Sequence, residues 1–244
     1  MIKKVKLPIL IWIFFVGIGW KNARMICQFG VGIYMLIYLC LILRENMQLS
    51  GFFYYLFLGV FQAATLHYFV AKIAGPFLFG HGWCGYACWT AIILDLLPFK
   101  VPKSHDRVPK LGLMRYVVFM IILGFTSTLF IFKIQNLDNI IFIIFILGNI
   151  LYHVVGIALA FFFKDNRAFC KYFCPITTFL KPCSYFSLMR IKKVEEKCIE
   201  CKKCVKVCPM DVDMLDNRHS RENGTECILC GTCVRVCPKK ALKM

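Results

Sequence analysis

The chain has 244 residues, of which 59% are hydrophobic, and its mean hydropathy is +0.68. A soluble domain of this length needs fewer apolar residues for its core, so the composition excludes an ordinary soluble enzyme and indicates an integral membrane protein. The formal net charge of +17 favours anionic lipid or an acidic protein as a partner. Nucleic acid is a poor fit, because the densest basic run, residues 164–206, adjoins an apolar segment.

The N-terminal segment, residues 1–24, is basic at its start and apolar between residues 7 and 20. The apolar stretch is shorter than the about 20 residues that a helix needs to cross a bilayer. No A-x-A-like cleavage site follows it, which argues against a secretory signal peptide. We expect an interfacial or half-inserted helix here, with a fifth span as the alternative.

Four later apolar runs are long enough to cross a bilayer as helices. They cover residues 25–43, 52–74, 112–134 and 140–163. Lys and Arg concentrate before the first run and in the loop of residues 80–111, and such residues mark the cytoplasmic side of short loops. The sequence therefore predicts an all-α bundle of about four transmembrane helices over residues 25–186. We expect it in the inner or plasma membrane, with the N- and C-termini in the cytoplasm.

Two cysteine phrases with the same spacing, C-x-x-C-x-x-C-x-x-x-C-P, lie at residues 198–209 and 227–238. Disulfides are rare in the cytoplasm, so dense cysteines there more often bind metal. In two-cluster bacterial ferredoxins this spacing supplies three thiolates to one [4Fe–4S] cluster and the fourth, before the proline, to the other. The predicted ligand sets are Cys198, Cys201, Cys204 and Cys237 for the first cluster, and Cys227, Cys230, Cys233 and Cys208 for the second.

Residues 187–244 are therefore predicted to form a small α+β domain of the bacterial 2[4Fe–4S] ferredoxin type. A zinc ribbon is one alternative, although tetrahedral zinc has no use for the extra cysteine and proline of each phrase. Clusters with a purely structural role are the other. Two clusters side by side suit an electron relay better than a structural staple, which needs only one.

Two further pairs of the form C-x-x-x-C follow the second and the fourth predicted spans: Cys84 with Cys88, and Cys170 with Cys174. Residues four apart share one face of a helix. The two-span hairpin between the pairs returns the chain to the membrane surface that it left. Four thiolates are the number that a third cluster requires. A redox-active dithiol, a metal-transfer site and plain packing of small side chains stay open as alternatives.

The order of these motifs, with C-x-x-x-C pairs after alternate spans and then a two-cluster phrase, resembles the membrane polyferredoxins of the NapH type. The resemblance covers roughly residues 20–244. It implies a membrane component that oxidises quinol and passes electrons through [4Fe–4S] clusters to a redox partner. The second pair matches the family motif at Arg167, Cys170, Cys174 and Pro175. The first pair departs from it, because Trp89 follows Cys88 in place of proline and His81 stands at the arginine position.

Ionisable residues inside the predicted spans are candidates for a quinone or proton site, because such residues are rare in lipid and usually functional. His67 lies in the second predicted span and His153 in the fourth, at similar depth. Hydrogen-bonded bundle histidines are the alternative, and we expect no haem between the two, since the resemblance implies none. Asp95, after the first cysteine pair, is the other candidate proton carrier, with an interfacial aspartate as its alternative.

Together these features predict a membrane-bound iron–sulfur electron carrier. It would connect the quinone pool, or the membrane face, with a redox protein such as a ferredoxin, a flavodoxin or a larger reductase complex, of which it would be the quinol dehydrogenase component. The rival prediction is an accessory or assembly factor whose C-x-x-x-C pairs handle metal or thiols. The sequence has no phosphate-binding glycine motif, so we expect neither NAD nor flavin.

Overall fold

The computed structural model describes residues 23–108, 110–132 and 137–244. The expected interfacial helix at residues 7–20 lies outside these ranges. Within them the chain is mostly helical, and three helices are long and apolar enough to cross a membrane. Their bounds are Arg24–Ile42, Leu111–Ile131 and Leu137–Phe163, which correspond to the first, third and fourth predicted spans. The fold therefore indicates a membrane protein.

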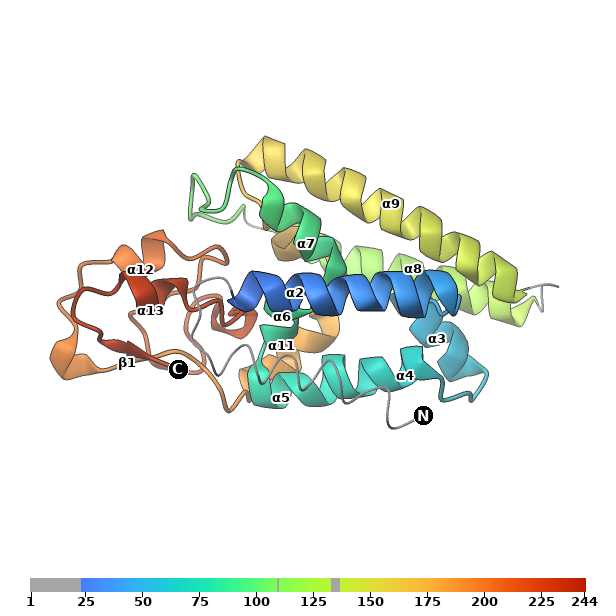
Figure 1. Cartoon of the computed structure of the whole chain (residues 1–244), viewed down its shortest axis with the longest axis horizontal. Helices are drawn as coiled ribbons and strands as arrows, with labels where there is room; N and C mark the ends of the chain where they lie inside the picture. The colour runs from blue at the N-terminus through green and yellow to red at the C-terminus, as the bar shows by residue number, and fades with distance from the viewer. Residues whose placement is uncertain (1–22, 109, 133–136) are drawn as a thin grey trace.

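The long helices run along the longest axis of the molecule (Figure 1). The elements of this bundle are α2 (Ala23–Ile33), its π-helical continuation η2 (Tyr34–Ile42), α3 (Leu49–Phe57), α4 (Ala63–His67), η3 (Tyr68–Ala74), α5 (Gly75–Phe79), η4 (Leu111–Leu113), α8 (Met114–Ile131) and α9 (Leu137–Phe163). Many isoleucine, leucine and phenylalanine side chains of α8 and α9 are exposed. An apolar exposed surface of this extent fits helices that face lipid.

The second predicted span, residues 52–74, is not a single helix. The structure has a break at residues 58–62, with α3 before it and one continuous helix, α4 with η3 and α5, over residues 63–79. Gly59 adopts a left-handed backbone conformation (φ 68°) that ends α3. Its neighbours are apolar up to Gln62, so hydropathy alone cannot detect the break. The helix α3 packs against α8 and α9 and is mostly buried.

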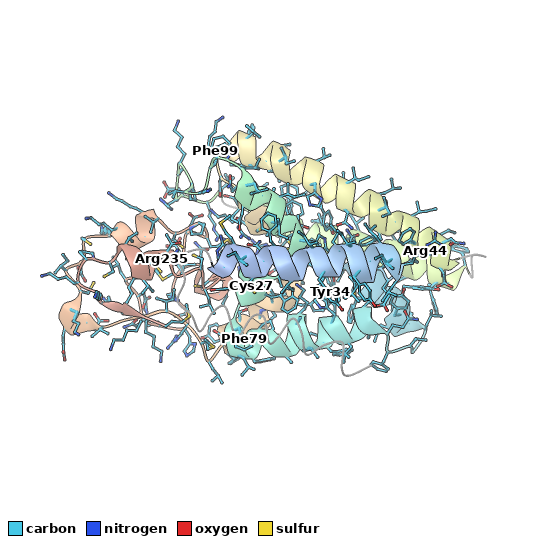
Figure 2. The ribbon with its side chains drawn as sticks, viewed as in Figure 1. Cys27, Tyr34, Arg44, Phe79, Phe99 and Arg235 are labelled. Carbon is cyan, nitrogen blue, oxygen red and sulfur yellow. The ribbon has the colours of Figure 1, made fainter. Side chains whose placement is uncertain are left out.

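The helices α6 (Gly82–Tyr86) and α11 (Thr177–Tyr185) lie at the end of the bundle that is next to the C-terminal tail, residues 187–244 (Figure 1). The other short helices at this end are α7 (Trp89–Leu96) and α10 (Ala168–Tyr172). Figure 2 shows Arg44, just after η2, at the opposite end of the molecule from Arg235 in the tail. The cysteines of all three predicted sites therefore gather towards one end.

The tail is closed by two antiparallel strands, β1 (Lys192–Lys193) and β2 (Leu242–Lys243). This pairing brings the start and the end of the tail together. Between the strands lie η5 (Glu195–Lys197), α12 (Lys203–Lys206), η6 (Gly224–Glu226) and α13 (Thr232–Val236). Each cysteine phrase contributes one short helix, α12 or α13, and the two helices pack together.

A buried ionic network fixes the tail to the bundle. Glu226 of the tail is fully buried, and its carboxylate accepts from Arg107 at 2.7 Å and from Arg115 at 2.8 Å. Burial would raise the pKa of Glu226, but the two guanidinium groups lower it to about 2, so the carboxylate is ionised at neutral pH. Asp211 of the tail forms an ion pair with Lys171 of α10. The tail supplies the anions and the bundle side the cations.

Candidate functional site

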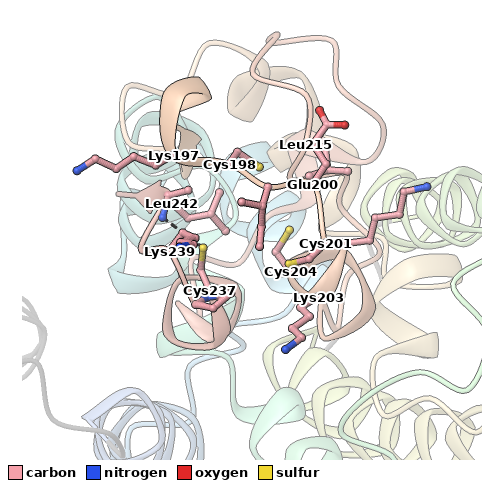
Figure 3. A pocket seen from close by; sticks show the side chains of 14 residues that line it. Lys197, Cys198, Glu200, Cys201, Lys203, Cys204, Leu215, Cys237, Lys239 and Leu242 are labelled. Carbon is pink, nitrogen blue, oxygen red and sulfur yellow. Dashed lines mark hydrogen bonds between the residues drawn. The ribbon is translucent and has the colours of Figure 1, made fainter.

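The first set of predicted cysteine ligands lies around one cavity of the tail (Figure 3). Cys198, Cys201 and Cys204 from the first phrase and Cys237 from the second line this cavity. Cys201 is solvent-exposed. The first cavity therefore opens near the surface of the tail.

The complementary set of cysteines lies around a second cavity. It is lined by Cys208 from the first phrase and by Cys227, Cys230 and Cys233 from the second. The structure thus groups the cysteines in the two crossed sets that the spacing predicts. Among the described residues no three His, Cys, Asp or Glu side chains converge on a point for a single metal ion. The sulfur atoms of each set surround a cavity instead.

The backbone around the two cavities repeats one conformation. Each phrase has a left-handed residue just before and just after its second cysteine, and another three residues beyond its last cysteine. These residues are Glu200, Lys202 and Asp211 in the first phrase, and Leu229, Gly231 and Lys240 in the second. A non-glycine residue in this conformation costs on the order of 1 kcal/mol, and such strain concentrates at functional sites. Five of these six residues are not glycine and therefore adopt a strained conformation. This strain indicates that both phrases are shaped around a ligand.

The donor chemistry of both cavities fits a [4Fe–4S] cluster, which proteins hold by four thiolates. Backbone N–H groups also donate to one sulfur of each set, from Val212 to Cys208 Sγ at 3.3 Å and from Ala241 to Cys237 Sγ at 3.2 Å. Such hydrogen bonds tune the reduction potential of a cluster. A cluster in each cavity would carry one electron at a time.

The four membrane-face cysteines also come together, although α8 and α9 separate the two pairs along the chain. Cys84 lies in α6 and Cys88 directly precedes α7, whereas Cys170 lies in α10 and Cys174 follows it. The pairs lie within electrostatic range of each other, Cys84 with Cys174, and Cys170 with both Cys84 and Cys88. Burial raises the pKa of the Cys84 thiol to about 12, although Lys72 opposes the shift. A free thiol at Cys84 would therefore be neutral at pH 7.

Two buried cations face these cysteines. Arg167, which is 1% exposed, donates to the Cys84 carbonyl at 3.2 Å, and its Nη1 lies 4.0 Å from Cys170 Sγ. Lys72, which is 6% exposed, holds its ammonium 5.1 Å from the ring centroid of Trp83, the residue before Cys84. Positive charge in a site shielded from water favours an anionic occupant.

Asp95 anchors two arginines at this site. Its carboxylate accepts from Arg24 at 3.0 Å and from Arg167 at 2.5 Å. Burial would raise the pKa of Asp95, but Arg167 and Arg24 lower it below its ordinary value. A carboxylate held ionised in two ion pairs is a poor proton carrier. The structure therefore favours a positioning role that neither sequence-based alternative included.

His81 stands at the position where the NapH-type motif has an arginine, and another residue supplies the guanidinium group. His81 is buried, and its Nδ1 shares a hydrogen bond with Ser184 Oγ at 3.1 Å. Burial lowers the pKa of His81 to about 4, so it is neutral at pH 7 and does not stand in for an arginine. Arg24 instead supplies a guanidinium to the turn, by donating to the Gly85 carbonyl at 3.1 Å.

The two histidines of the predicted spans have different surroundings. The His67 ring packs edge-on against Trp83, with 4.9 Å between the ring centroids. His153 donates from Nδ1 to the Asn149 carbonyl, one turn earlier in α9, at 2.7 Å. His67 therefore lies beside the membrane-face cysteines, whereas the contacts of His153 fit a hydrogen-bonded bundle histidine.

The membrane-face turn is in direct contact with the second cavity of the tail. A Cβ atom at Gly85 would lie 2.5 Å from the carbonyl oxygen of Ile228. The Tyr86 hydroxyl donates to the Leu229 carbonyl at 2.9 Å. Ile228 and Leu229 both belong to the second cysteine phrase, and Ile228 lines the second cavity. The turn that follows Cys84 and the second cysteine phrase therefore meet at this junction.

Comparisons with protein families connect both cysteine regions with iron–sulfur proteins. The model of a 4Fe–4S dicluster domain matches residues 197–242, which contain both tail phrases. The model of a 4Fe–4S binding domain matches residues 62–103 and 150–193, which contain the two C-x-x-x-C pairs. These matches indicate an iron–sulfur protein with ferredoxin-type regions, and electron transfer as its general function.

Two relatives are known from Methanocaldococcus jannaschii. Uncharacterized protein MJ0750 is 27% identical over 210 residues, which are 74% of this chain and 87% of the relative. Uncharacterized protein MJ0749 is 27% identical over 181 residues, which are 70% of this chain and 68% of the relative. No solved structure matches the chain.

Sequence reasoning missed three contributors to the membrane-face site: Lys72, Arg24 and Trp83. Lys72 could have been found from the sequence, because it is a lone lysine in an apolar segment. Ionisable residues in such segments are functional candidates, which is the reason that His67 was considered. Arg24 could not have been found in this way, since its partner Asp95 is distant in the chain and only the fold brings the two together. Trp83 is one of many aromatic residues, and only its contacts mark it.

Proposed function

We propose that this chain is a membrane-bound electron relay of the NapH type. It passes electrons between the membrane face and a redox protein through two [4Fe–4S] clusters in the tail and a third iron–sulfur centre at Cys84, Cys88, Cys170 and Cys174. The observation that carries the proposal is the close packing of Gly85, in the Cys84 turn, on the second cysteine phrase. A relay requires its centres to lie close together, whereas a separate metal-handling site does not.

The positions of the three sites support one route. The membrane-face cysteines border the second cavity through Gly85 and Tyr86. The second cavity adjoins the first, because each cysteine phrase contributes to both. The first cavity opens towards solvent at the exposed Cys201. Electrons would thus enter or leave at the lipid side and at the outer surface of the tail.

Quinol is the membrane substrate that we propose. Its oxidation releases protons together with electrons, so its site needs a proton acceptor close to an electron carrier. His67 is the candidate acceptor that lies beside this site, because its ring contacts Trp83, the residue before Cys84. His153 and Asp95 are weaker candidates, since each already has a hydrogen-bond or ion-pair partner.

The outer surface of the tail suits an acidic electron-transfer protein, such as a small ferredoxin or a flavodoxin. Four exposed lysines line the first cavity: Lys197, Lys202, Lys203 and Lys239. Glu200 is the one acid among the residues that line it. Ile199, which is 58% exposed, adds an apolar contact between the first two cysteines. Complementary charge of this kind steers a partner and orients it on contact.

We further propose four membrane crossings with the N- and C-termini in the cytoplasm. The continuous helix over residues 63–79 supplies the second crossing. At 1.5 Å per residue it is about 25 Å long, close to the about 30 Å of a hydrocarbon core. This arrangement puts the tail on the same side as the lysine- and arginine-rich loop of residues 80–111, in agreement with the positive-inside rule.

The relay is tested by anaerobic reduction of the purified protein in liposomes. Quinol is added, and reduction of the iron–sulfur centres is followed by EPR and visible absorbance, with dithionite as the reference reductant. A quinol relay predicts reduced centres with quinol itself. Reduction by dithionite alone would refute it and favour the accessory or assembly factor. His67→Gln should slow the reduction by quinol, and His153→Gln is the matched control.

A further inference from the structure

The buried cations of the bundle differ in their partners. Three have carboxylates: Arg167 pairs with Asp95, Arg115 with Glu226 and Lys171 with Asp165. Lys72 differs from these three. In the part of the chain that the structure describes, the groups near its ammonium that could become anions are cysteine thiols, those of Cys84, Cys88 and Cys174.

We propose that Lys72 is the built-in counter-ion of the iron–sulfur centre at the membrane face, and that its charge raises the reduction potential of that centre. The inference rests on the third centre of the proposed relay. Lys72 is not part of either C-x-x-x-C motif, although it lies within the matched residues 62–103.

The charge balance of the site carries the proposal. An ammonium buried without an anion is costly, because the bundle replaces its hydration poorly. Neutral thiols would leave that cost in place. A cluster held by four thiolates has a net negative charge and offsets it. Reduction adds a further electron, which the fixed positive charge stabilises, so the potential of the centre rises.

The geometry of η3 holds Lys72 at the cysteines. A π-helical turn places residues five apart on one face, and His67 and Lys72 are five apart. Both contact Trp83, the His67 ring at 4.9 Å and the Lys72 ammonium at 5.1 Å from its centroid. The indole covers the ammonium and adds a cation–π contact. The proposed proton acceptor and the proposed counter-ion therefore meet on one residue beside Cys84.

The test compares three variants of the full-length protein. Lys72→Met removes the charge, and Lys72→Arg keeps it. Lys164→Met is the matched control, because Lys164 also lies over an aromatic ring, that of Phe99 at 5.0 Å, but is exposed. The readouts are iron per chain and the midpoint potential of each centre in an EPR-monitored redox titration. We expect Lys72→Met to lower the potential of the membrane-face centre alone, and both other variants to behave as wild type.

The outcomes separate this inference from the relay. Wild-type potentials in Lys72→Met, with about twelve irons retained, would overturn the counter-ion and leave the relay intact. About eight irons in the wild-type protein itself would remove the third centre, and the inference with it. If Lys72→Met loses one set of irons and Lys72→Arg keeps it, the need for charge is supported. Loss in both variants would show a packing role and overturn the inference.

Discussion

The tail and the membrane face use the same side chain, cysteine, in opposite ways. In the tail, both sets come from two nearby phrases whose left-handed residues, at matched positions, turn the backbone around each cavity. At the membrane face, the cysteines come from distant turns that Asp95, Arg24 and Arg167 hold together. The first arrangement is made by local backbone conformation and the second by tertiary packing.

This difference predicts how each region fails. A site made by local conformation survives disturbance elsewhere, as long as its own phrase is intact. A site made by packing depends on helices, ion pairs and close backbone contacts that lie outside it. Variants can therefore target one region and use the other as an internal reference.

The largest effect is expected from loss of a whole centre. The double variant Cys84→Ser with Cys88→Ser should lower the iron content from about twelve to about eight per chain, because a [4Fe–4S] cluster needs all its thiolates. Iron and acid-labile sulfide are measured on anaerobically purified protein. The EPR signals of the tail should persist, because the tail cysteines are all in place.

Cys183→Ser is the control for this experiment, because Cys183 lies in α11 at the same end but belongs to neither C-x-x-x-C pair. It should keep about twelve irons. An unchanged iron content in Cys84→Ser with Cys88→Ser would contradict the third centre. The membrane-face cysteines would then be thiols, and the contrast between the two regions would concern chemistry as well as construction.

The next largest effect concerns the ionic network that joins the two regions. Glu226→Gln leaves the buried Arg115 without its carboxylate, and it leaves the half-buried Arg107 with Asp211, at 3.6 Å, as its remaining carboxylate. Breaking a buried pair by loss of one partner typically costs about 3–5 kcal/mol. We expect a lower melting temperature by calorimetry and easier proteolysis between bundle and tail. Glu196→Gln, at an exposed position, is the control, and an equal effect of both variants would refute a role for the network.

The same carboxylate predicts a pH dependence. The pKa of Glu226 is lowered from 4.5 to about 2, so its ion pairs contribute fully above 4.5, and the contribution is lost as the pH falls from 4.5 towards 2. The difference in melting temperature between wild type and Glu226→Gln should stay constant from neutral pH down to about 5 and shrink below 4.5. A difference that shrinks already around neutral pH would point to another titrating group.

Sequence pattern predicted the tail better than the membrane face for the same physical reason. Spacing within a phrase determines which sulfur atoms can reach one cavity, and the structure groups them that way. Hydropathy predicted the three membrane-length helices of the described residues, because each is an unbroken apolar run. It missed the break at Gly59, since a glycine among apolar residues changes the backbone and not the hydropathy.

The C-x-x-x-C spacing identified the two turns that the structure brings together, and the two-span hairpin between them predicted that the pairs meet. Their polar surroundings could not be predicted. The partners of Asp95 lie far away on both sides of it in the chain, and no periodic pattern connects them. The left-handed residues at the matched positions of the two phrases were equally hidden, because five of the six are not glycine.

A smaller effect is expected at the contact between the regions. Gly85→Ala places a Cβ 2.5 Å from the Ile228 carbonyl oxygen, so the turn or the phrase must move. Overpacking of this kind typically costs about 1–3 kcal/mol. We expect a lower melting temperature and slower reduction of the tail clusters by quinol. Gly124→Ala, in α8 with open space around it, is the control and should be neutral or slightly stabilising.

The smallest effect is expected at the outer surface of the tail, where a partner would dock. Lys197→Glu with Lys203→Glu reverses two exposed charges beside the first cavity without touching a cysteine. Reversal of rim charges changes the association rate and its salt dependence more than the lifetime of a complex. We expect roughly tenfold slower reduction of an added acidic ferredoxin at low salt, with the difference vanishing at high salt because screening removes the steering.

Lys100→Glu is the control for this surface, because Lys100 is exposed in the linker after α7 and does not line the first cavity. If it slows transfer as much as the tail variant does, the partner responds to net charge and not to the first cavity. If only the tail variant slows electron transfer, electrons pass to the ferredoxin at the first cavity of the tail. The membrane-face cysteines would then form the other end of the relay. The two ways of building a cysteine site would then correspond to the two ends of the relay.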